Sequence, residues 1–512
     1  MQRTHDWHRV RCQSYPKAAY GGVHSTIYKS LGRSSAYKAA SLSSIIPTSV
    51  HLFLLPSDNS QDTPSSEPSS RIISYKPGAQ VGHITIVIHI RITLTDAGCS
   101  TLWVDMSDIV EKLKEYLCDH PHVYAAFDLA VQIALRMNVP QLAQWGIYNL
   151  DDYLKFYEKF LHWMPVERFD GKNVYYHICI FYFILDLPPL KDLQTSILPT
   201  SKAPYTWLSD WIIEFAKDMG KNMDKPESLT KESLQTFYDS PIYRMEDYPV
   251  PKGGWRSFNH FFARNIYPNL RPIDFPNDDT AIVGPADSVF DGSWDIEQDG
   301  VVYLKYIPWS IKQLLADSDY AGEFNGGIFT HSFLAPYDYH RQHAPVSGKV
   351  LEAKVIPGLC YLEVVATPDQ NGELSLGMRR GLPPARSNRG LERLTGPITL
   401  QENTVSAPDS PGYQFIQARG LILIDNPVIG LVAVLPIGMA QISSVLLSVK
   451  KGETVRKGQE VSYFQCGGSD CVMIFQARAN VQFSATLDRH YNFGQQIAKA
   501  FPDRDASIIA QR

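Results

Sequence analysis

The stretch Cys466-Gly467-Gly468-Ser469-Asp470, followed by the apolar run Cys471–Phe475, is the part of the chain around which the rest is organised. Two consecutive glycines permit positive φ angles and let other groups approach a backbone carbonyl closely. Ser469 places a hydroxyl beside the carbonyl of Gly468, so a base and an oxyanion donor would allow chemistry on the backbone itself. Taken alone, the stretch is explained more simply as a Gly-Gly hairpin that leads into a strand.

The composition is typical of a globular protein with more than one domain. A chain of 512 residues exceeds what one core usually holds. It contains 48 Lys and Arg against 53 Asp and Glu, so no basic field for nucleic acid is visible. Seven scattered cysteines without CxxC pairs favour a reducing compartment and argue against a zinc ribbon or a disulfide scaffold.

The N-terminal region, residues 1–100, is predicted to be of low complexity or disordered, with one strand over 84–94. Pro56–Ser70 is rich in Ser and Pro and resembles a linker. The longest continuous apolar run, Ile178–Leu185, is far shorter than the roughly 20 residues of a transmembrane helix. We expect a cytoplasmic protein; the basic, Ser-rich residues 1–57 leave a mitochondrial location as the alternative.

Residues 105–245 are predicted to form an α-helical domain. Asp108 and Glu111 have the spacing of a capping pair, and Gly220 is a candidate for the residue that follows a helix end. Apolar side chains recur at helical spacing, and we expect them to form a core without chemistry. The three stripes are Val110, Leu113 and Leu117; Phe127, Ala130, Val131, Ala134 and Leu135, closed by Pro140; and Leu208, Ile212, Phe215 and Met219.

Residues 253–512 have the texture of a mostly antiparallel β domain. Apolar segments become short, β-branched and bounded by Gly and Pro. Pro368–Pro411 interrupts them, and a loop of that length is usually functional or disordered. The predicted class is α+β, with an N-terminal helical domain followed by a β domain of barrel-sandwich-like halves. The expected strands include Lys349–Ile356, Gly420–Ile424, Ile429–Pro436 and Val445–Ser448.

Three further stretches carry polar residues that a core does not need. They are Phe258–Arg264 followed by Arg271-Pro272-Ile273, then Gly284–Ser288, and then Tyr339–Lys349. In the second, Asp287 could cap a turn. In the third, His340 and His343 could bind a metal or simply contact backbone carbonyls. No third ligand follows at a sensible spacing, so we expect no metal. On a helical turn, this spacing would point both histidines toward one pocket.

In this order, the stretches resemble the phosphatidylserine decarboxylase family of pyruvoyl enzymes, over about Gly253–Phe475. The resemblance consists of an FFxR…RPI element, a PAD element, a YHRxHxPxxG element and the glycine–serine self-cleavage site. Pro436–Ser444 is also similar to the family's glycine-rich strand before that site. Within the family, the chain resembles the soluble fungal L-tryptophan decarboxylase branch.

The resemblance implies a self-generated cofactor. Ser469 would attack the carbonyl of Gly468, with His343 as base and Asp287 as the carboxylate that orients it. β-Elimination and hydrolysis would leave a covalent pyruvoyl group on residue 469 and release residues 469–512 as a small chain. The keto group would form a Schiff base with the substrate amine and accept the electrons left by CO₂. His340 would return a proton to carbon.

Two positions depart from the family pattern. Asp470 stands where the family usually has Ser or Thr, and Ser288 replaces a glycine. A carboxylate beside the cleavage site could bond within the turn or raise the cost of the adjacent oxyanion. Neither departure removes a reacting group, so they bear on the rate of self-cleavage. Asp470 also leaves open a non-cleaving pseudoenzyme that serves as a scaffold.

The resemblance implies a carboxy-lyase that acts on an α-amino acid. The helical domain, the His-Ala-Pro-Val element and the Ile-Gly-Met element favour a free aromatic amino acid such as L-tryptophan, giving tryptamine. The alternative substrate is phosphatidylserine, giving phosphatidylethanolamine. The implied partners are the substrate and the two processed chains, with no nucleic acid; peripheral membrane contact and homo-oligomers remain open.

A carrier domain is an alternative interpretation that would give part of the chain a non-catalytic function. Ser347–Val350 and Val445–Val461 are similar to lipoyl or biotinyl carriers in their glycine spacing. A carrier lysine needs Met, Asp or Ala beside it, and Lys450-Lys451 lacks such neighbours. We therefore expect a shared β architecture without the carrier function.

Overall fold

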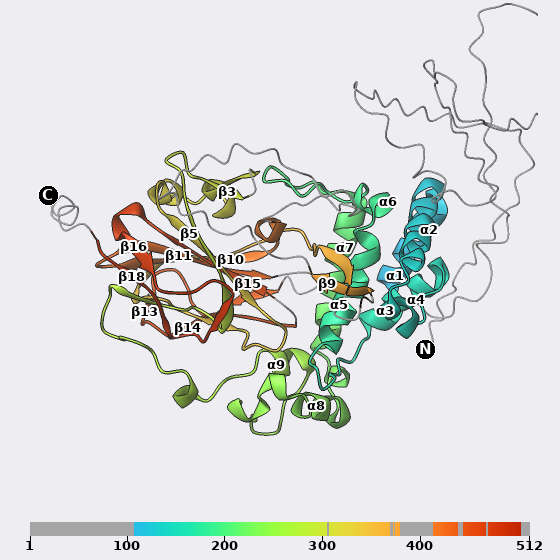
Figure 1. Ribbon diagram of the computed structural model, residues 1–512, viewed down its shortest axis with the longest axis horizontal. Helices are drawn as coiled ribbons and strands as arrows, with labels where there is room; N and C mark the ends of the chain where they lie inside the picture. The colour runs from blue at the N-terminus through green and yellow to red at the C-terminus, as the bar shows by residue number, and fades with distance from the viewer. Residues whose placement is uncertain are drawn as a thin grey trace, which may run out of the picture. The chain divides into compact units, whose positions relative to one another are not determined.

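The computed structural model describes residues 107–304, 307–368, 372, 374–378, 413–438, 444–466 and 469–502. The strand expected over 84–94, the linker at Pro56–Ser70 and most of the 368–411 segment lie outside these ranges. Thr101–Arg512 form one compact unit, in which the helices come first along the chain and the sheets follow (Figure 1).

The predicted helical stripes are buried faces of real helices. Two details of the prediction are wrong. α7 continues through Gly220 to Met223, and Ser107 rather than Asp108 is the N-cap residue of α1. The helices are α1 Asp108–Asp119, α2 Pro121–Arg136, α3 Pro140–Gln144, α4 Leu150–Leu161, α5 Asn173–Leu185, α6 Pro188–Lys191, α7 Trp207–Met223, α8 Lys231–Tyr238, α9 Phe258–Phe262 and α10 Ile311–Leu314.

The apolar run Ile178–Leu185 forms the C-terminal part of α5, where every one of its residues is buried. A helix that is apolar on all sides belongs in the interior of a domain. Glu167 fixes its N-terminus by accepting hydrogen bonds from the N–H of Asn173 (2.6 Å) and the hydroxyl of Tyr243 (2.9 Å). Among the described residues, no helix is both long enough and apolar enough to cross a membrane.

The sheets confirm the α+β class, and every pairing between named strands is antiparallel. The largest is open, with the order β13-β7-β10-β11-β15-β5-β2-β17; the smaller ones are β1-β18-β16, β12-β14-β6, β3-β4 and β8-β9. The strands are β1 Ala281–Val283, β2 Ser288–Asp295, β3 Val301–Leu304, β4 Ile307–Ser310, β5 Ile328–Leu334, β6 Arg341–His343, β7 Gly348–Ile356, β8 Val364–Pro368, β9 Leu374–Met378, β10 Arg419–Asn426, β11 Gly430–Gly438, β12 Val445–Leu447, β13 Thr454–Val455, β14 Glu460–Phe464, β15 Ser469–Phe475, β16 Val481–Phe483, β17 Arg489–Tyr491 and β18 Gln496–Ala500.

The large sheet separates two hydrophobic clusters. Along β15, Val472 and Ile474 belong to one cluster, whereas Cys471, Met473 and Phe475 belong to the other. This alternation follows from the two-residue period of a strand. The first cluster also contains the buried faces of α1 to α7, so it runs across the expected border at 245–253. The helical and sheet regions therefore share a core.

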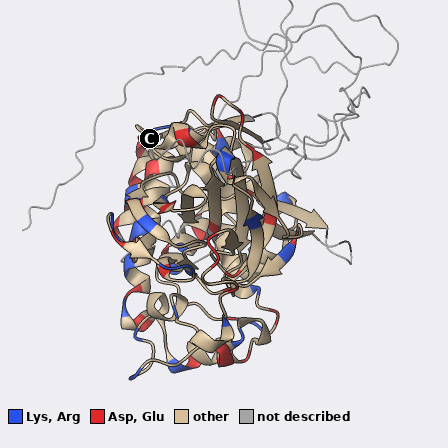
Figure 2. Cartoon of the chain, turned by 90° about the vertical axis from the view of Figure 1, so that its left-hand side faces the viewer, with Lys and Arg blue, Asp and Glu red and all other residues tan. Residues whose placement is uncertain are grey.

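Polar contacts join α5 and the residue that follows it to the β8–β9 hairpin, among them a contact of 3.3 Å between the hydroxyls of Tyr176 and Ser375. The N–H of Val364 donates to the buried carboxylate of Asp186 (2.7 Å), and the N–H of Met378 donates to the hydroxyl of Tyr175 (2.7 Å). In the view of Figure 2, the positions of basic and acidic residues, blue and red, are interspersed along the described chain. This distribution agrees with the nearly balanced count of charges.

Candidate active site

Ser469 is the first residue of β15, where the chain enters the middle of the large sheet. It is paired with Gly438 at the end of β11 on one side and with Leu334 at the end of β5 on the other. The first three residues of the glycine-rich segment Pro436–Ser444 thus pair with Ser469, Asp470 and Cys471, directly beside the predicted cleavage site. Gly467 and Gly468 lie outside the described residues, as do positions 439–443.

The segment before Ser469 passes from one sheet to another. β14 pairs with β12 and β6, whereas β15 pairs with β11 and β5. The simpler hypothesis of a Gly-Gly hairpin between β14 and β15 is therefore wrong. β6 carries His343 and pairs with β14, the strand that precedes Ser469 in the chain. His343 therefore lies opposite Glu460 of β14. The N–H of Phe464 donates to the carbonyl of His340 at 3.0 Å.

His343 is buried and held from several sides. Its backbone N–H donates to the carbonyl of Pro285 (2.7 Å), and its ring lies parallel to that of Phe493, with centroids 3.6 Å apart. Nδ1 is 2.9 Å from the carbonyl oxygen of Gly458, so Nδ1 carries the proton. Nε2, 3.3 Å from the hydroxyl of Tyr339, is then the acceptor.

Burial lowers the pKa of His343 to about 4, more strongly than its hydrogen bond to Gly458 and the charges of Glu460 and Asp287 raise it. The ring is therefore neutral at neutral pH, with a lone pair on Nε2. A group that takes a proton from a serine hydroxyl needs this protonation state.

Asp287 forms a buried ion pair with Arg271, the arginine of the Arg-Pro-Ile element. Nη2 of Arg271 lies 2.6 Å from Oδ2, and Nε lies within 3.1 Å of both carboxylate oxygens. The N–H of Phe493 also donates to Oδ1 (2.8 Å). The carboxylate is thus satisfied by these groups and makes no hydrogen bond to His343. The two predicted residues are linked indirectly, because Phe493 binds Asp287 through its backbone and stacks on His343 through its ring.

His340 occupies a different environment from His343. Its ring is fully buried and stacks on Phe262 of α9, with centroids 4.1 Å apart, and its Nε2 lies 3.3 Å from the carbonyl oxygen of Pro336. The expectation of a helical turn is wrong, since Arg341–His343 form a strand. His340 precedes this strand, and the two rings have different neighbours, Phe262 for His340 and Phe493 for His343. Burial, followed by the charge of Arg264, lowers the pKa of His340 to about 3, so it is neutral as well.

A family model described as phosphatidylserine decarboxylase matches residues 258–499, which include every residue described above in this site. Decarboxylase iboD of Amanita muscaria is 28% identical, over 57% of this chain and 82% of its own. A phosphatidylserine decarboxylase proenzyme of Fusobacterium nucleatum is 27% identical, over 53% of this chain and 73% of its own. A third relative, phosphatidylserine decarboxylase proenzyme 3 of Schizosaccharomyces pombe, is 29% identical over 50% of this chain and 22% of its own.

Over residues 258–499, the chain belongs to the phosphatidylserine decarboxylase family. It is a carboxy-lyase, as the family is, and the family is in general pyruvoyl-dependent. In the described part of this decarboxylase, no three His, Cys, Asp or Glu side chains are grouped so that they could hold a metal ion.

A second carboxylate–histidine pair in this decarboxylase was missed at the sequence level. Nε2 of His490, on β17, lies 3.1 Å from Oδ1 of Asp338, whose other oxygen accepts the N–H of Ala335 (2.7 Å). Burial raises the pKa of Asp338, and the hydrogen bond to Asp338 raises that of His490. Asp338 directly precedes the Tyr-His-Arg element, but its partner is 152 residues away in the sequence, so only the fold joins them.

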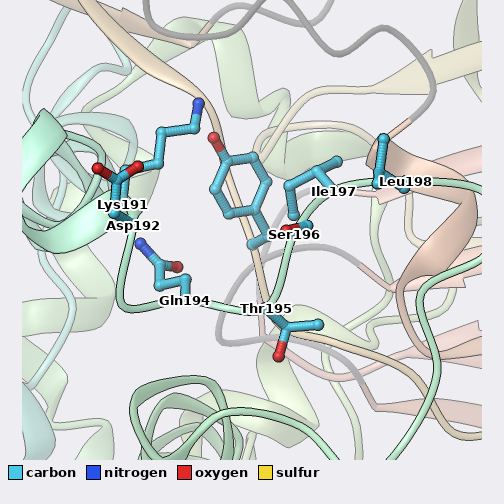
Figure 3. A pocket seen from close by; sticks show the side chains of 8 residues that line it. Lys191, Asp192, Gln194, Thr195, Ser196, Ile197 and Leu198 are labelled. Carbon is cyan, nitrogen blue, oxygen red and sulfur yellow. The ribbon is translucent and has the colours of Figure 1, made fainter. Parts of the chain in front are cut away.

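Two hollows of the decarboxylase are large enough to admit a small ligand. One, of about 450 Å³, lies between α9, the η1 turn at Pro226–Ser228 and β14, and ends at Gln465, four residues before Ser469; it is lined by Asp224, Pro226, Arg256, Ser257, Asn259, His260, Ala263, Arg341, Tyr463 and Gln465. The other, of about 310 Å³, lies beside the loop after α6. Its wall is formed by residues 191–198, with Lys191 near one end and Leu198 at the other, together with Tyr361 (Figure 3).

Proposed function

We propose that this decarboxylase processes itself between Gly468 and Ser469 and then decarboxylates a free aromatic amino acid such as L-tryptophan. Three features of the site support self-processing. Ser469 is the first residue of β15 and pairs with Gly438, the last residue of β11. A neutral His343 lies on β6, which pairs with β14, the strand that precedes β15 in the chain. A buried ion pair between Arg271 and Asp287 stabilises the loop that carries Asp287.

The proposed self-cleavage uses only atoms of this chain and water. The Ser469 hydroxyl attacks the carbonyl carbon of Gly468 and loses its proton to a base, for which His343 is the candidate. The Gly468–Ser469 amide bond breaks as the ester forms, and the amine of residue 469 takes up a proton. Loss of the α-proton of residue 469 then breaks its Cβ–O bond and releases the Gly468 carboxylate. Water replaces the nitrogen of the remaining dehydroalanine and ammonia departs, leaving a pyruvoyl group.

The residues present fit such a group, because Ser469 is held on both sides by β11 and β5 and stays in the sheet whether or not the chain before it is cut. When formed, the group would supply an electron-accepting carbonyl, the role that the pyridinium ring of PLP has in other decarboxylases. The role of this chain is to position the substrate, exclude water and return a proton to carbon, for which His340 is the candidate.

The pocket between α9 and β14 carries the substrate proposal. Its rim bears groups of both signs, with Arg256 and Arg341 against Asp224, and its wall includes the ring of Tyr463. Charges of opposite sign suit the ammonium and carboxylate of a free amino acid, and an aromatic wall suits an aromatic side chain. A volume of about 450 Å³ holds one such molecule and not two acyl chains. Of the relatives described above, the one from Amanita muscaria is named only as a decarboxylase, without a lipid.

The deciding experiment incubates the purified protein separately with L-tryptophan, L-tyrosine, L-phenylalanine, several non-aromatic amino acids and phosphatidylserine vesicles, and measures CO₂ and amine. We expect turnover of the free aromatic amino acids that survives EDTA, is not raised by added PLP and is abolished by phenylhydrazine, which captures carbonyl groups. Turnover of phosphatidylserine alone would favour the lipid enzyme. A chain that stays whole under denaturing mass spectrometry would favour the non-cleaving scaffold.

Location in the cell and assembly of the two chains are tested by separate measurements. We propose that the protein acts in the cytoplasm, and fractionation of cells that express it, with a mitochondrial marker as reference, tests this placement. Denaturing mass spectrometry of the purified protein should give a large chain and residues 469–512 as a small chain whose N-terminus is blocked. Size-exclusion chromatography under native conditions should keep the two together, since β15 lies between β11 and β5.

A further inference from the structure

His331 lies between two carboxylates on three neighbouring strands of the large sheet. Its Nδ1 is 2.6 Å from Oδ2 of Asp291 on β2, and its Nε2 is 3.7 Å from Oδ1 of Asp470 on β15. The side chains of His331 and Asp470 are 1% and 0% exposed, whereas that of Asp291 is 19% exposed. The sheet thus buries a histidine–carboxylate pair and connects it to solvent through one outer carboxylate.

A β-bulge places Asp291 in this position. The pairing of β2 with β5 shifts between Phe290 and Gly292, so Asp291 is the extra residue. Gly292, opposite His331, has φ +144°, and a Cβ there would approach the Trp294 ring to 3.2 Å. Glycine is therefore required at the bulge. Bulges re-aim a side chain out of the regular alternation of a strand, and this one directs Asp291 to the imidazole.

His331 carries a positive charge. Both of its ring nitrogens face carboxylate oxygens, and only the imidazolium has a proton on each nitrogen to donate. Burial by itself would lower the pKa of His331, but the charge of Asp470 and the hydrogen bond to Asp291 raise it to about 9. The imidazolium and the buried carboxylate of Asp470 therefore neutralise each other inside the sheet.

Asp470 directly follows Ser469 in the sequence. An unpaired carboxylate there would oppose the negative charge that develops on the Gly468 oxygen when its carbonyl is attacked. We propose that His331, held by Asp291, is the counter-ion of Asp470 and a positioning residue for self-cleavage between Gly468 and Ser469. This role rests on the proposed function and adds a residue pair outside the expected Asp287–His343–Ser469 set.

The effect acts through charge and strand position. Asp470 faces the cluster that contains Val472, and the His331 ring meets the edge of Phe415 there, with centroids 6.0 Å apart. Two like unit charges about 6 Å apart at an effective dielectric constant of about 20 repel enough to slow formation of an oxyanion by roughly 10²-fold. This repulsion is removed when position 470 is neutral, so the consequence of losing His331 depends on residue 470.

The experiment follows self-cleavage in freshly synthesised full-length chains by denaturing electrophoresis, for the wild type, His331→Gln, Asp470→Asn and the double variant. We expect His331→Gln to lower the rate constant by roughly 10²-fold. Asp470→Asn and the double variant should agree within about threefold, because the counter-ion has no charge left to balance. Glu167→Gln serves as the control, since it removes a buried carboxylate of the helical region and lowers the melting temperature without changing the rate constant.

Rate constant and final extent of cleavage are read separately. A purely structural pair would reduce the fraction of chains that fold and cleave, and leave the rate constant of the folded fraction unchanged. That result, or a double variant as slow as His331→Gln, would overturn the counter-ion role while leaving self-cleavage intact. A wild-type chain that never cleaves would overturn the proposed function itself and this role with it.

Discussion

The ring of Phe493 lies flat against the imidazole of His343, with centroids 3.6 Å apart and planes inclined by 3°. The two residues come from opposite sides of the predicted cleavage point. The backbone N–H of Phe493 also donates to Asp287. One residue of the C-terminal segment therefore contacts both His343, the expected base, and Asp287, the carboxylate expected to orient it. The segment 469–512 therefore completes the site as well as providing the serine.

Replacing Phe493 by Ala should free the His343 ring. We expect a loss of about 3–5 kcal/mol in the free energy of unfolding, typical of a buried Phe→Ala change. Self-cleavage of the folded chain should slow by roughly tenfold, because a mobile base spends less time in the productive orientation. The control is Phe483→Ala, which removes an aromatic ring of the same segment that packs on Phe290, away from His343. Equal cleavage rate constants in the two variants would contradict a positioning role for Phe493.

Ser469→Ala should remain a single chain without decarboxylase activity, because alanine has no hydroxyl to attack Gly468. Denaturing mass spectrometry of the purified variant measures this directly. Ser484→Ala, an exposed serine of the same segment, should split like the wild type. If the Ser469 variant still divides at this bond, another nucleophile must be responsible.

Asp287→Asn and Arg271→Lys should both slow self-cleavage. The bidentate ion pair holds the loop whose Pro285 carbonyl accepts the backbone N–H of His343, and lysine cannot reproduce the planar fork of arginine. Breaking a buried pair by removing one partner costs about 3–5 kcal/mol of stability. Cleavage rate constants and melting temperatures of both variants test this. A slow Asp287→Asn variant beside a normal Arg271→Lys variant would show instead that Asp287 acts on His343 without help from the arginine.

Stability should fall on both sides of about pH 6.5, for opposite reasons. Burial lowers the pKa of His340 to about 3 and that of His343 to about 4, so below pH 6.5 the unfolded chain binds protons that the folded chain does not, and acid destabilises the fold. His331 has a raised pKa of about 9, so its stabilisation is complete below 6.5 and is lost as pH rises through 9.

Melting temperatures of the wild type and His331→Gln at pH 4, 6.5 and 9 check this pH dependence. The variant should keep the decline in acid and lose most of the decline toward pH 9. An alkaline decline of the same size in both proteins would show that groups other than His331 cause it.

His340→Ala should still cleave and give two chains, since the ring of His340 stacks on Phe262, whereas that of His343 stacks on Phe493. Its single-turnover release of CO₂ should slow by roughly 10²–10⁴-fold if His340 returns the proton to carbon. The test is demanding because burial lowers the pKa of His340 to about 3, and the resulting neutral imidazole is a weak acid. A near-normal rate with a lower melting temperature would assign His340 to packing against Phe262.

The chemical motifs could be recognised in the sequence because each consists of residues that lie within a short stretch of the chain. The glycine–serine stretch, the apolar run of β15 and the helical stripes of α1 and α2 are all local patterns. Local patterns also indicated the class of the fold, since the apolar segments become short, β-branched and bounded by Gly and Pro after residue 253. The predicted end of α7 at Gly220 was wrong because a glycine within a helix costs only about 1 kcal/mol of stability. The buried side chains of Met219 and Met223, before and after Gly220, keep the helix packed through that position.

Only the tertiary structure decided which polar groups face each other. Asp287 takes Arg271 and the Phe493 backbone as partners, His490 reaches Asp338 across 152 residues, and His331 meets Asp470 because β5 lies beside β15. Side-chain types name the candidates for such pairs, but strand order and register select among them. Once water is excluded, a buried charge must be paired where the fold leaves it, and that pairing sets which histidines are neutral and which is charged.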